Sequence, residues 1–260
     1  MRDSWDDRIR RARALAAIQS ASTSLLEFYG ALLVAQQTAY ENLRQEREAP
    51  AGSLERDLPK LHAGTAAILK TVAQSGPPPL ASDARVLLEG EPEAIETLLL
   101  RWWHTPADDE FFAKASLQPY AQWLAGRGIR PIDRALPHAD SPCPFCGGAA
   151  QVSILDAAAD SAPGGRLLQC GTCLTSWPVR RVLCPYCAEE DEHRLAYYHA
   201  PEFDHLRVDV CESCRHYVKT VDLTRLGIAV PLVDEVAGAP LDIWAREQGY
   251  RKIQLNLVGL

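Results

Sequence analysis

Cysteine thiols are the side chains of this chain best suited to chemistry, and all eight lie between residues 143 and 214. They form four Cys-x-x-Cys pairs: Cys143 and Cys146, Cys170 and Cys173, Cys184 and Cys187, Cys211 and Cys214. A spacer of this length lets two thiolates meet one ion from a tight turn, and two such turns complete a tetrahedral four-sulfur site. The pattern predicts metal binding by all eight cysteines.

An internal repeat assigns the pairs to two sites. In each half, 23 residues separate one pair from the next, and matching cysteines of the two halves are offset by 41 residues. The first pair of each half also shares the pattern Cys-Pro-aromatic-Cys. The duplicated register predicts two self-contained sites. Because each unit is too small for a full apolar core, metal binding would supply folding free energy on the order of 10 kcal/mol.

Other arrangements of the cysteines stay open at this point. Only ten residues separate Cys173 from Cys184, so the two middle pairs are close enough in sequence to share one ion. Disulfides within the pairs are disfavoured in a reducing compartment. An iron–sulfur cluster is disfavoured because such clusters usually show less regular spacing. Zinc and a single rubredoxin-type iron suit a four-sulfur site equally well.

Composition excludes several classes of protein. The net charge is −7, from 27 basic and 34 acidic side chains, which is the reverse of the basic surplus typical of nucleic-acid binders. No apolar run is long enough to cross a membrane, and the first residues lack an apolar signal core. We therefore expect a cytoplasmic protein that neither inserts into a membrane nor binds nucleic acid.

The first half of the chain must position these sites, and its apolar spacing indicates helices. Steps of three and four from Leu15 predict one long amphipathic helix that ends near Pro50. Further helices are predicted over 54–72, from a cap at Ser82 or Asp83 through Leu88, and from Pro92 to Trp103. In a last helix, around 111–124, Pro119 is expected to cause a kink or a split.

The second half reads as short strands and a final helix. Runs at 151–155 and 206–210 favour hairpin strands, and residues 240–247 favour a helix that stops at Gly249. The predicted fold class is α+β. It consists of an all-α domain (1–137), two tandem rubredoxin-like or zinc-ribbon four-cysteine modules (138–181 and 182–225) and a C-terminal tail with a helix (226–260).

Several aromatic and histidine residues have ordinary structural explanations. Trp177 and Tyr217 follow the second pair of each unit and are expected to pack over the metal hairpin. Trp102 and Trp103 are adjacent, so we expect one in the core and the other at a contact between domains. The histidines near the second unit are not expected to bind metal, because four cysteines already complete the site; they are His193, His199 and His205.

The extended cysteine motifs resemble one known family, the FdhE formate dehydrogenase accessory proteins. The resemblance lies in the order of the four pairs and in the residues that surround them. It is carried by Cys170-Gly171-Thr172-Cys173-Leu174-Thr175-Ser176-Trp177-Pro178-Val179-Arg180, by Cys211-Glu212-Ser213-Cys214-Arg215-His216-Tyr217-Val218-Lys219-Thr220-Val221-Asp222, and by Leu241-Asp242 with Glu247-Gln248-Gly249-Tyr250.

The resemblance implies a cytoplasmic assembly chaperone that helps to mature a molybdenum-containing formate dehydrogenase and binds its catalytic subunit before export. It also implies two rubredoxin-type iron ions, with zinc as the alternative. It is tightest around Tyr217, Lys219 and Thr220, which are therefore the candidate partner-binding residues.

The chain is not expected to be an enzyme, because it lacks a nucleophile elbow and a phosphate loop, and closed four-sulfur sites leave no open coordination position. Two alternatives are a rubredoxin-type electron-transfer or redox-sensing protein and, less favoured, a zinc-ribbon nucleic-acid module.

Overall fold

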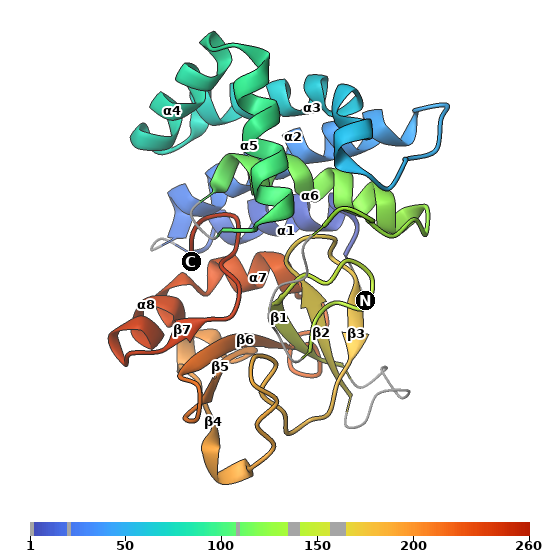
Figure 1. The fold of residues 1–260 in the computed structure, drawn as a ribbon. Coiled ribbons are helices and arrows are strands. Elements are labelled where there is room, and N and C mark those ends of the chain that lie inside the picture. Colours follow the sequence, from blue (N-terminus) through green and yellow to red (C-terminus); the bar gives the residue numbers. More distant parts are fainter. Residues whose placement is uncertain (1–2, 20–21, 108–109, 135–140, 157–164) are drawn as a thin grey trace.

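The computed structural model describes residues 3–19, 22–107, 110–134, 141–156 and 165–260. Helices come first along the chain: α1 (Trp5–Ala16), α2 (Thr23–Arg44), α3 (Leu54–Ser75), α4 (Pro78–Glu89), α5 (Pro92–His104) and α6 (Phe111–Gly126). Strands follow, with two short 3₁₀ turns between them: β1 (Ala150–Leu155), β2 (Arg166–Cys170), β3 (Ser176–Pro178), β4 (Leu195–Tyr198), β5 (Leu206–Cys211) and β6 (His216–Asp222). The chain ends with α7 (Pro231–Ala237), α8 (Ala239–Glu247) and β7 (Arg251–Lys252). This order confirms the α+β class (Figure 1).

The prediction of one long helix from Leu15 is wrong in its first part, because α1 ends at Ala16 and a separate helix, α2, begins at Thr23. Ile18, which lies one step of three after Leu15 and would share its apolar face in such a helix, is 75% exposed. The hydroxyl of Thr23 donates to the carbonyl oxygens of Ala16 and Gln19. Side chains of this kind compete with the helix for backbone groups, which accounts for the break. A capping box between Ser4 and Asp7 starts α1, a helix that the apolar spacing did not indicate.

Helix α6 runs through Pro119 as one helix, so the expected split is wrong. A proline cannot donate to the carbonyl four residues earlier, here that of Ala115. The side chain of Gln36 on α2 supplies the missing donor: its Nε2 lies 2.8 Å from Ala115 O. A side chain from a neighbouring helix therefore replaces the lost backbone hydrogen bond.

Three helices begin at a proline: α4, α5 and α7. Helix α5 begins at Pro92, as predicted. Helix α4 begins at Pro78, ahead of the predicted cap at Ser82, because a proline at the first helical position already has a suitable φ.

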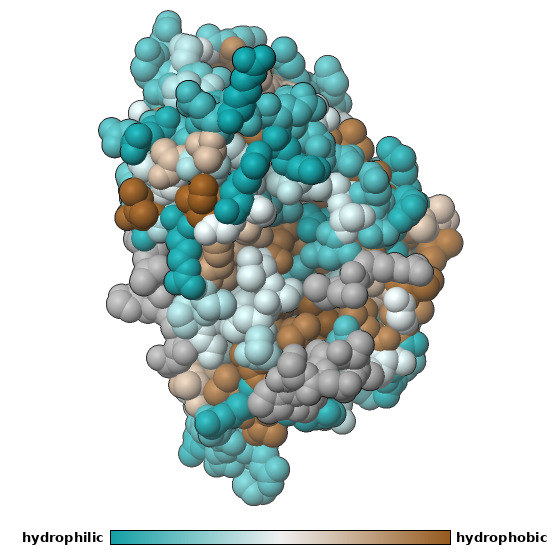
Figure 2. Space-filling model, turned by 90° about the vertical axis from the view of Figure 1, so that its right-hand side faces the viewer, coloured by the Kyte–Doolittle hydropathy of each residue, from teal (hydrophilic) through white to brown (hydrophobic). Residues whose placement is uncertain are grey.

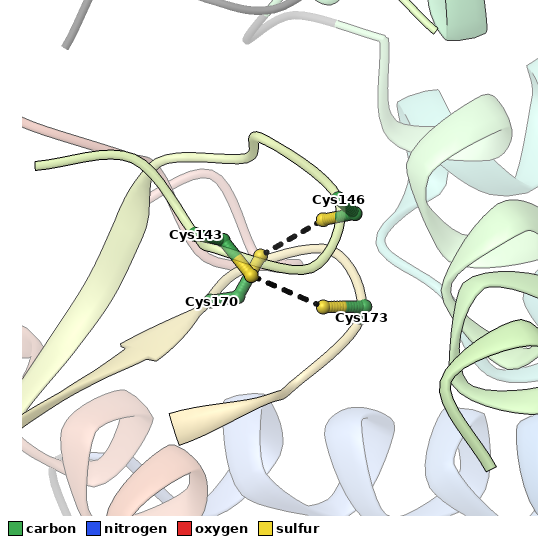
Figure 3. Close-up of side chains that lie close together, drawn as sticks. All are labelled: Cys143, Cys146, Cys170 and Cys173. Carbon is green, nitrogen blue, oxygen red and sulfur yellow. Dashed lines mark hydrogen bonds between the residues drawn. The ribbon is translucent and has the colours of Figure 1, made fainter. Parts of the chain in front are cut away.

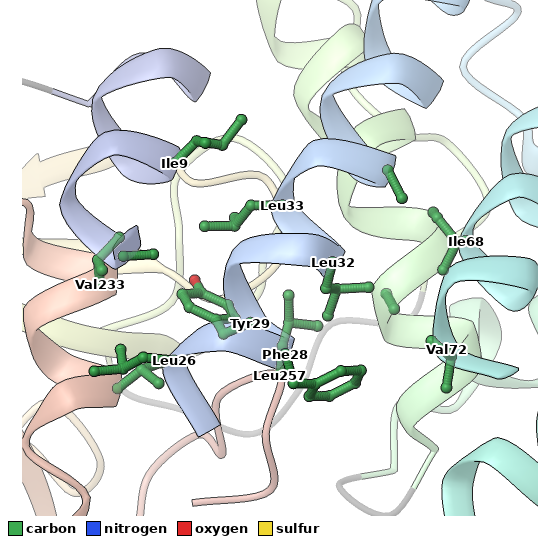
Figure 4. Close-up of a cluster of buried hydrophobic side chains, with 14 of the residues drawn as sticks. Ile9, Leu26, Phe28, Tyr29, Leu32, Leu33, Ile68, Val72, Val233 and Leu257 are labelled. Carbon is green, nitrogen blue, oxygen red and sulfur yellow. The ribbon is translucent and has the colours of Figure 1, made fainter. Parts of the chain in front are cut away.

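Close packing of α2 against α3 organises the helical core. A Cβ on Gly64 of α3 would lie only 2.8 Å from the Cβ of Ala39 on α2, so glycine is required for this approach. Leu26 and Leu32 of α2 and Ile68 of α3 are fully buried in one cluster (Figure 4). Val233 of α7 belongs to the same cluster, which ties the C-terminal part of the chain to the helices.

One sheet contains strands from both cysteine units, in the order β3-β2-β1-β6-β5-β4, with β7 beside β6. The predicted strands at 151–155 and 206–210 are confirmed as β1 and β5. The units join where β1 pairs in parallel with β6, from Val152 opposite Lys219 to Leu155 opposite Asp222. Helix α7 contacts β1, β6 and α1 and so lies between the sheet and the helices (Figure 1).

The proposed domain boundaries fall within this shared framework. The division at 181 and 182 separates β3 from β4, which lie at opposite ends of the sheet. The tail that begins at 226 contributes α7, α8 and β7, all of which contact the sheet. The final helix is confirmed as α8, whereas α7 was not predicted. We propose that the four predicted segments are successive units along the chain that share one sheet and its covering helices.

The surface shows how apolar side chains are distributed. On the face in Figure 2, hydrophilic side chains cover most of the helical part, and hydrophobic ones gather lower down, near the sheet. Among the helices in the described part of the chain, none has both the length and the apolar character that a membrane crossing requires.

Candidate metal centres

The first four cysteines lie together in a cluster that we call the inner quartet: Cys143, Cys146, Cys170 and Cys173 (Figure 3). The Sγ atoms of Cys143 and Cys173 are 3.6 Å apart, and those of Cys146 and Cys170 are 3.5 Å apart. Metal–sulfur bonds of about 2.3 Å in a tetrahedron place sulfurs about 3.8 Å apart. The quartet therefore has nearly the size that one zinc or iron ion requires.

The last four cysteines form the outer quartet: Cys184, Cys187, Cys211 and Cys214. Two Sγ–Sγ distances are 3.7 Å, from Cys184 to Cys214 and from Cys187 to Cys211. In each quartet all ligand atoms lie within 4.8 Å of one another. The grouping follows the sequence repeat, and the shared site between the middle pairs is not formed. The part of the chain that the structure describes can thus hold two metal ions.

Tight turns of one type carry every pair. The residue after the second cysteine has a left-handed backbone in all four cases, with φ of 71° at Gly147, 59° at Leu174, 56° at Ala188 and 58° at Arg215. In three turns the amide of that residue donates to the carbonyl of the first cysteine. Only one of the four is glycine, so the other three turns are held at a cost of about 1 kcal/mol each.

Neighbouring sulfurs and burial shift the pKa of several thiols in opposite directions. Hydrogen bonds from neighbouring thiols, that of Cys146 first, lower the pKa of Cys143, whereas burial raises the pKa of Cys170. In the outer quartet, burial raises the pKa of Cys184 to about 12. Crowded sulfurs in a poorly solvated site cannot all ionise by themselves. A divalent cation would replace the remaining protons and stabilise all four thiolates, so the donor chemistry fits a metal.

Helices and an arginine cover the inner quartet. All four residues are at most 3% exposed and share a buried cluster with side chains of α5 and α6. The guanidinium of Arg134 lies 3.7 Å from Cys146 Sγ and 3.0 Å from the hydroxyl of Thr172. It also lies over the rings of Trp102 and Trp103, at 5.4 and 4.8 Å from their centroids. Arg134 belongs to no motif, so sequence reasoning missed it.

Three tryptophans in the same cluster as the inner quartet are buried: Trp102, Trp103 and Trp177. Trp177 is buried in the same cluster as the inner quartet, as expected for packing over the hairpin. Trp102 and Trp103 are both buried, so the expectation that only one is in the core is wrong. Their ring nitrogens donate in different directions, to Ala107 O and to a carboxylate oxygen of Asp133.

The outer quartet has thinner cover. Cys187 and Cys214 are only half-buried. The ring of Tyr186 stacks on His216 at 3.6 Å, and His216 Nδ1 lies 2.8 Å from Cys214 O. Neither quartet includes a histidine among the described residues. Instead, His205 Nε2 lies 2.8 Å from a carboxylate oxygen of Asp234.

The candidate partner-binding residues Tyr217, Lys219 and Thr220 lie on β6 and are at most 1% exposed. The Tyr217 hydroxyl donates to Asp242 at 2.8 Å, and Lys219 pairs with Glu235 and Asp242. The Thr220 hydroxyl lies on the opposite face of the strand and donates to a carboxylate oxygen of β5 at 2.7 Å. Their role in partner binding stays a prediction, and their observed contacts are all internal.

Comparisons with known proteins agree on one family. Residues 142–181 match the model "FdhE, central domain", and residues 182–258 match "FdhE, C-terminal domain". The Protein FdhE homolog of Aquifex aeolicus is 30% identical over 195 residues, which are 74% of this chain and 68% of that protein. The homolog of Pseudomonas putida is 31% identical over 152 residues, which are 56% of this chain but only 47% of that protein.

A solved structure shares the fold. The crystal structure of the FdhE protein from Pseudomonas aeruginosa superposes with a TM-score of 0.72 at 22% identity, over 99% of this chain and 97% of that one. The two matched family regions meet between residues 181 and 182, which is also where the cysteine repeat divides. Together, the two family models and the Aquifex relative show that this chain belongs to the FdhE family.

Proposed function

We propose that each quartet binds one metal ion and that all eight cysteines are ligands. Four sulfurs spaced for one tetrahedral ion support this proposal, and the strained turns give metal binding a folding role. The family resemblance favours rubredoxin-type iron, with zinc as the alternative. Iron in such a site exchanges one electron, whereas zinc only holds the fold.

We infer that the chain is a cytoplasmic accessory protein for formate dehydrogenase, and that it binds the catalytic subunit through the metal-stabilised sheet and the helices. Membership in the FdhE family carries this proposal. A non-catalytic role is consistent with the quartets, because four protein ligands per ion leave no coordination position for a substrate.

Deletion of the gene tests the role. The mutant should lose formate oxidation, measured as formate-dependent dye reduction, while an immunoblot still detects the dehydrogenase catalytic subunit. The gene returned with Arg180→Gln, an exposed position, should restore activity, whereas Cys211→Ser with Cys214→Ser should not. Normal formate oxidation in the deletion strain would reject the accessory role.

Binding to the catalytic subunit is tested separately. The tagged full-length chain, purified without oxygen, should retain the catalytic subunit from an extract of the same organism. The double cysteine variant should lose it, and Arg180→Gln should keep it. If the wild-type chain restored formate oxidation in the deletion strain but did not retain the catalytic subunit, the accessory role would not require a stable complex.

Electron transfer is the second candidate, and the half-buried Cys187 and Cys214 favour it because they bring two sulfurs close to solvent. It predicts a red protein that is reversibly reduced in an anaerobic titration. If zinc-substituted protein matured the dehydrogenase as well as iron protein, electron transfer would not be the function.

A further inference from the structure

The two quartets share one sequence pattern but differ in what surrounds them. The inner quartet is enclosed between the sheet and helices α5 and α6. The outer quartet belongs to none of the buried apolar clusters of the described residues, and half of its cysteines reach solvent. Both hold the same donor atoms at the same spacing, so the difference lies in access rather than in ligand chemistry.

Arg134 is specific to the inner quartet. Four thiolates around a divalent ion carry a net charge of −2, which the guanidinium of the half-buried Arg134 partly offsets through a charge-assisted hydrogen bond. The side chain is fixed from both sides, by Trp102 and Trp103 on α5 and by Thr172 in the turn between Cys170 and Cys173, which we call the inner metal turn. Ion loss from this quartet would therefore require α5, Arg134 and the metal turn to separate.

A second connection also joins the inner turn to the helices. Gln118 Nε2 on α6 donates to Gly171 O, between the two cysteines of the turn, at 3.1 Å. Gln36 of α2 in turn donates to Gln118 Oε1 at 3.2 Å. The inner metal turn is thus hydrogen-bonded through α6 to α2.

The outer turns are tied to the C-terminal segment: Arg215 donates to Gln248 O at 2.6 Å, and the Tyr250 hydroxyl donates to Glu212. Ser213, which is exposed, donates to the half-buried Glu189 across the quartet at 2.5 Å. The Arg215 guanidinium turns away from the sulfurs, pairing with Glu212 at 2.6 Å and lying 3.9 Å from the Tyr250 ring. Opening this end of the sheet would expose the sulfurs without moving a helix of the N-terminal part.

We propose that the two centres have different roles: the inner one is a permanent cross-link between helices and sheet, and the outer one is the exchangeable, thiol-reactive centre. Arg134 is the positioning residue that retains the inner ion. The inference rests on the proposal that each quartet holds one ion. Elemental analysis of the starting protein tests that proposal independently, since it must give two ions per chain.

The experiment uses full-length protein loaded anaerobically with Zn²⁺ and freed of excess metal. Transfer of zinc to the chromophoric chelator pyridylazoresorcinol should occur in two phases of one equivalent each, with the first at least about tenfold faster, because local opening costs less than separating a packed interface. Alkylation by iodoacetamide, followed by mass spectrometry of the wild-type chain, should modify Cys187 and Cys214 during the first phase.

Arginine variants test the retention role. Arg134→Gln should accelerate the slow phase by about tenfold, in line with other losses of outer-shell contacts to a metal site, and leave the fast phase unchanged. Arg134→Lys, which keeps the positive charge, should restore part of the retention. Arg180→Gln, an exposed arginine paired with Glu190, should change neither phase.

Either of two results would overturn the proposal. Release of both equivalents in one phase would show that access does not distinguish the centres. Alkylation of Cys143 or Cys146 as early as Cys187 would show the same without any variant, even if Arg134→Gln fails to fold.

Discussion

Replacing Gln36 by leucine should destabilise the protein. Pro119 has no N–H to donate to the carbonyl oxygen of Ala115, and Gln36 supplies the donor in its place. Gln36 is fully buried, and its Nε2 lies 2.8 Å from Ala115 O. Leucine has a similar volume, so little cavity forms. A buried carbonyl without a partner costs about 1–3 kcal/mol, and we expect the free energy of unfolding to fall by about 2 kcal/mol.

Pro119→Ala isolates this contribution. Alanine restores a backbone N–H that can reach Ala115 O in the usual helical geometry. In that background, Gln36→Leu should cost less than about 1 kcal/mol, which leaves a coupling energy of about 1–2 kcal/mol between the two positions. The packing lost by removing the proline ring is the same in both variants that carry the Pro119→Ala change, so it cancels in the cycle.

Equilibrium urea denaturation of the metal-loaded protein, followed by circular dichroism of the helices, measures all four free energies. Because Gln36 also hydrogen-bonds Gln118, which reaches the inner metal turn, the Gln36→Leu variant should release its slow zinc equivalent faster. An equal cost of Gln36→Leu with proline or alanine at position 119 would refute the reasoning.

Three further predictions concern other parts of the molecule. Lys219→Met removes a buried partner of Glu235 and Asp242 and should lower the free energy of unfolding, measured by urea denaturation, by about 3–5 kcal/mol. The control Lys70→Met, at an exposed position, should change it by no more than about 0.5 kcal/mol. Equal losses in the two variants would contradict the prediction. Ala188→Gly relieves a left-handed turn and should tighten zinc binding at the outer quartet about threefold in a chelator competition, while Ala196→Gly, in β4, should not. Burial alone would raise the pKa of Asp234, but hydrogen bonds from His205 and Arg11 outweigh it and lower that pKa from 3.8. The contribution of Asp234 to the free energy of unfolding is therefore complete at higher pH and is lost as pH falls through the lowered pKa. The difference in unfolding free energy between wild type and Asp234→Asn should therefore be constant near neutrality and shrink below about pH 4; a difference that grows on acidification would exclude this assignment.

Local patterns allowed part of the molecule to be predicted. The cysteine spacing indicated both quartets because each turn places its two sulfurs through backbone geometry alone. Strands β1 and β5 and helices α5 and α8 followed from apolar patterning and prolines. The same kind of signal failed at Thr23, where a side-chain hydrogen bond ends the pattern.

Contacts between distant segments could not be predicted. The parallel pairing of β1 with β6 makes β6 an interior strand, and α7 and α8 then cover one of its faces. Lys219 consequently lies in a buried ionic cluster with Glu235 and Asp242. Arg134 reaches Cys146 only because α5 and the metal turn meet in space.

The two cysteine units contact each other head to tail, through the pairing of β1 with β6. The offset of 41 residues maps β2 onto β5 and β3 onto β6, so the joint pairs the first strand of one unit with the last strand of the other. A contact of this kind, if repeated between molecules, would build a ring or a filament. Here β3 ends after three residues at Pro178, which has no N–H for a further ladder. The sheet therefore presents only a short edge at β3, which is poorly suited to accept a strand from another molecule.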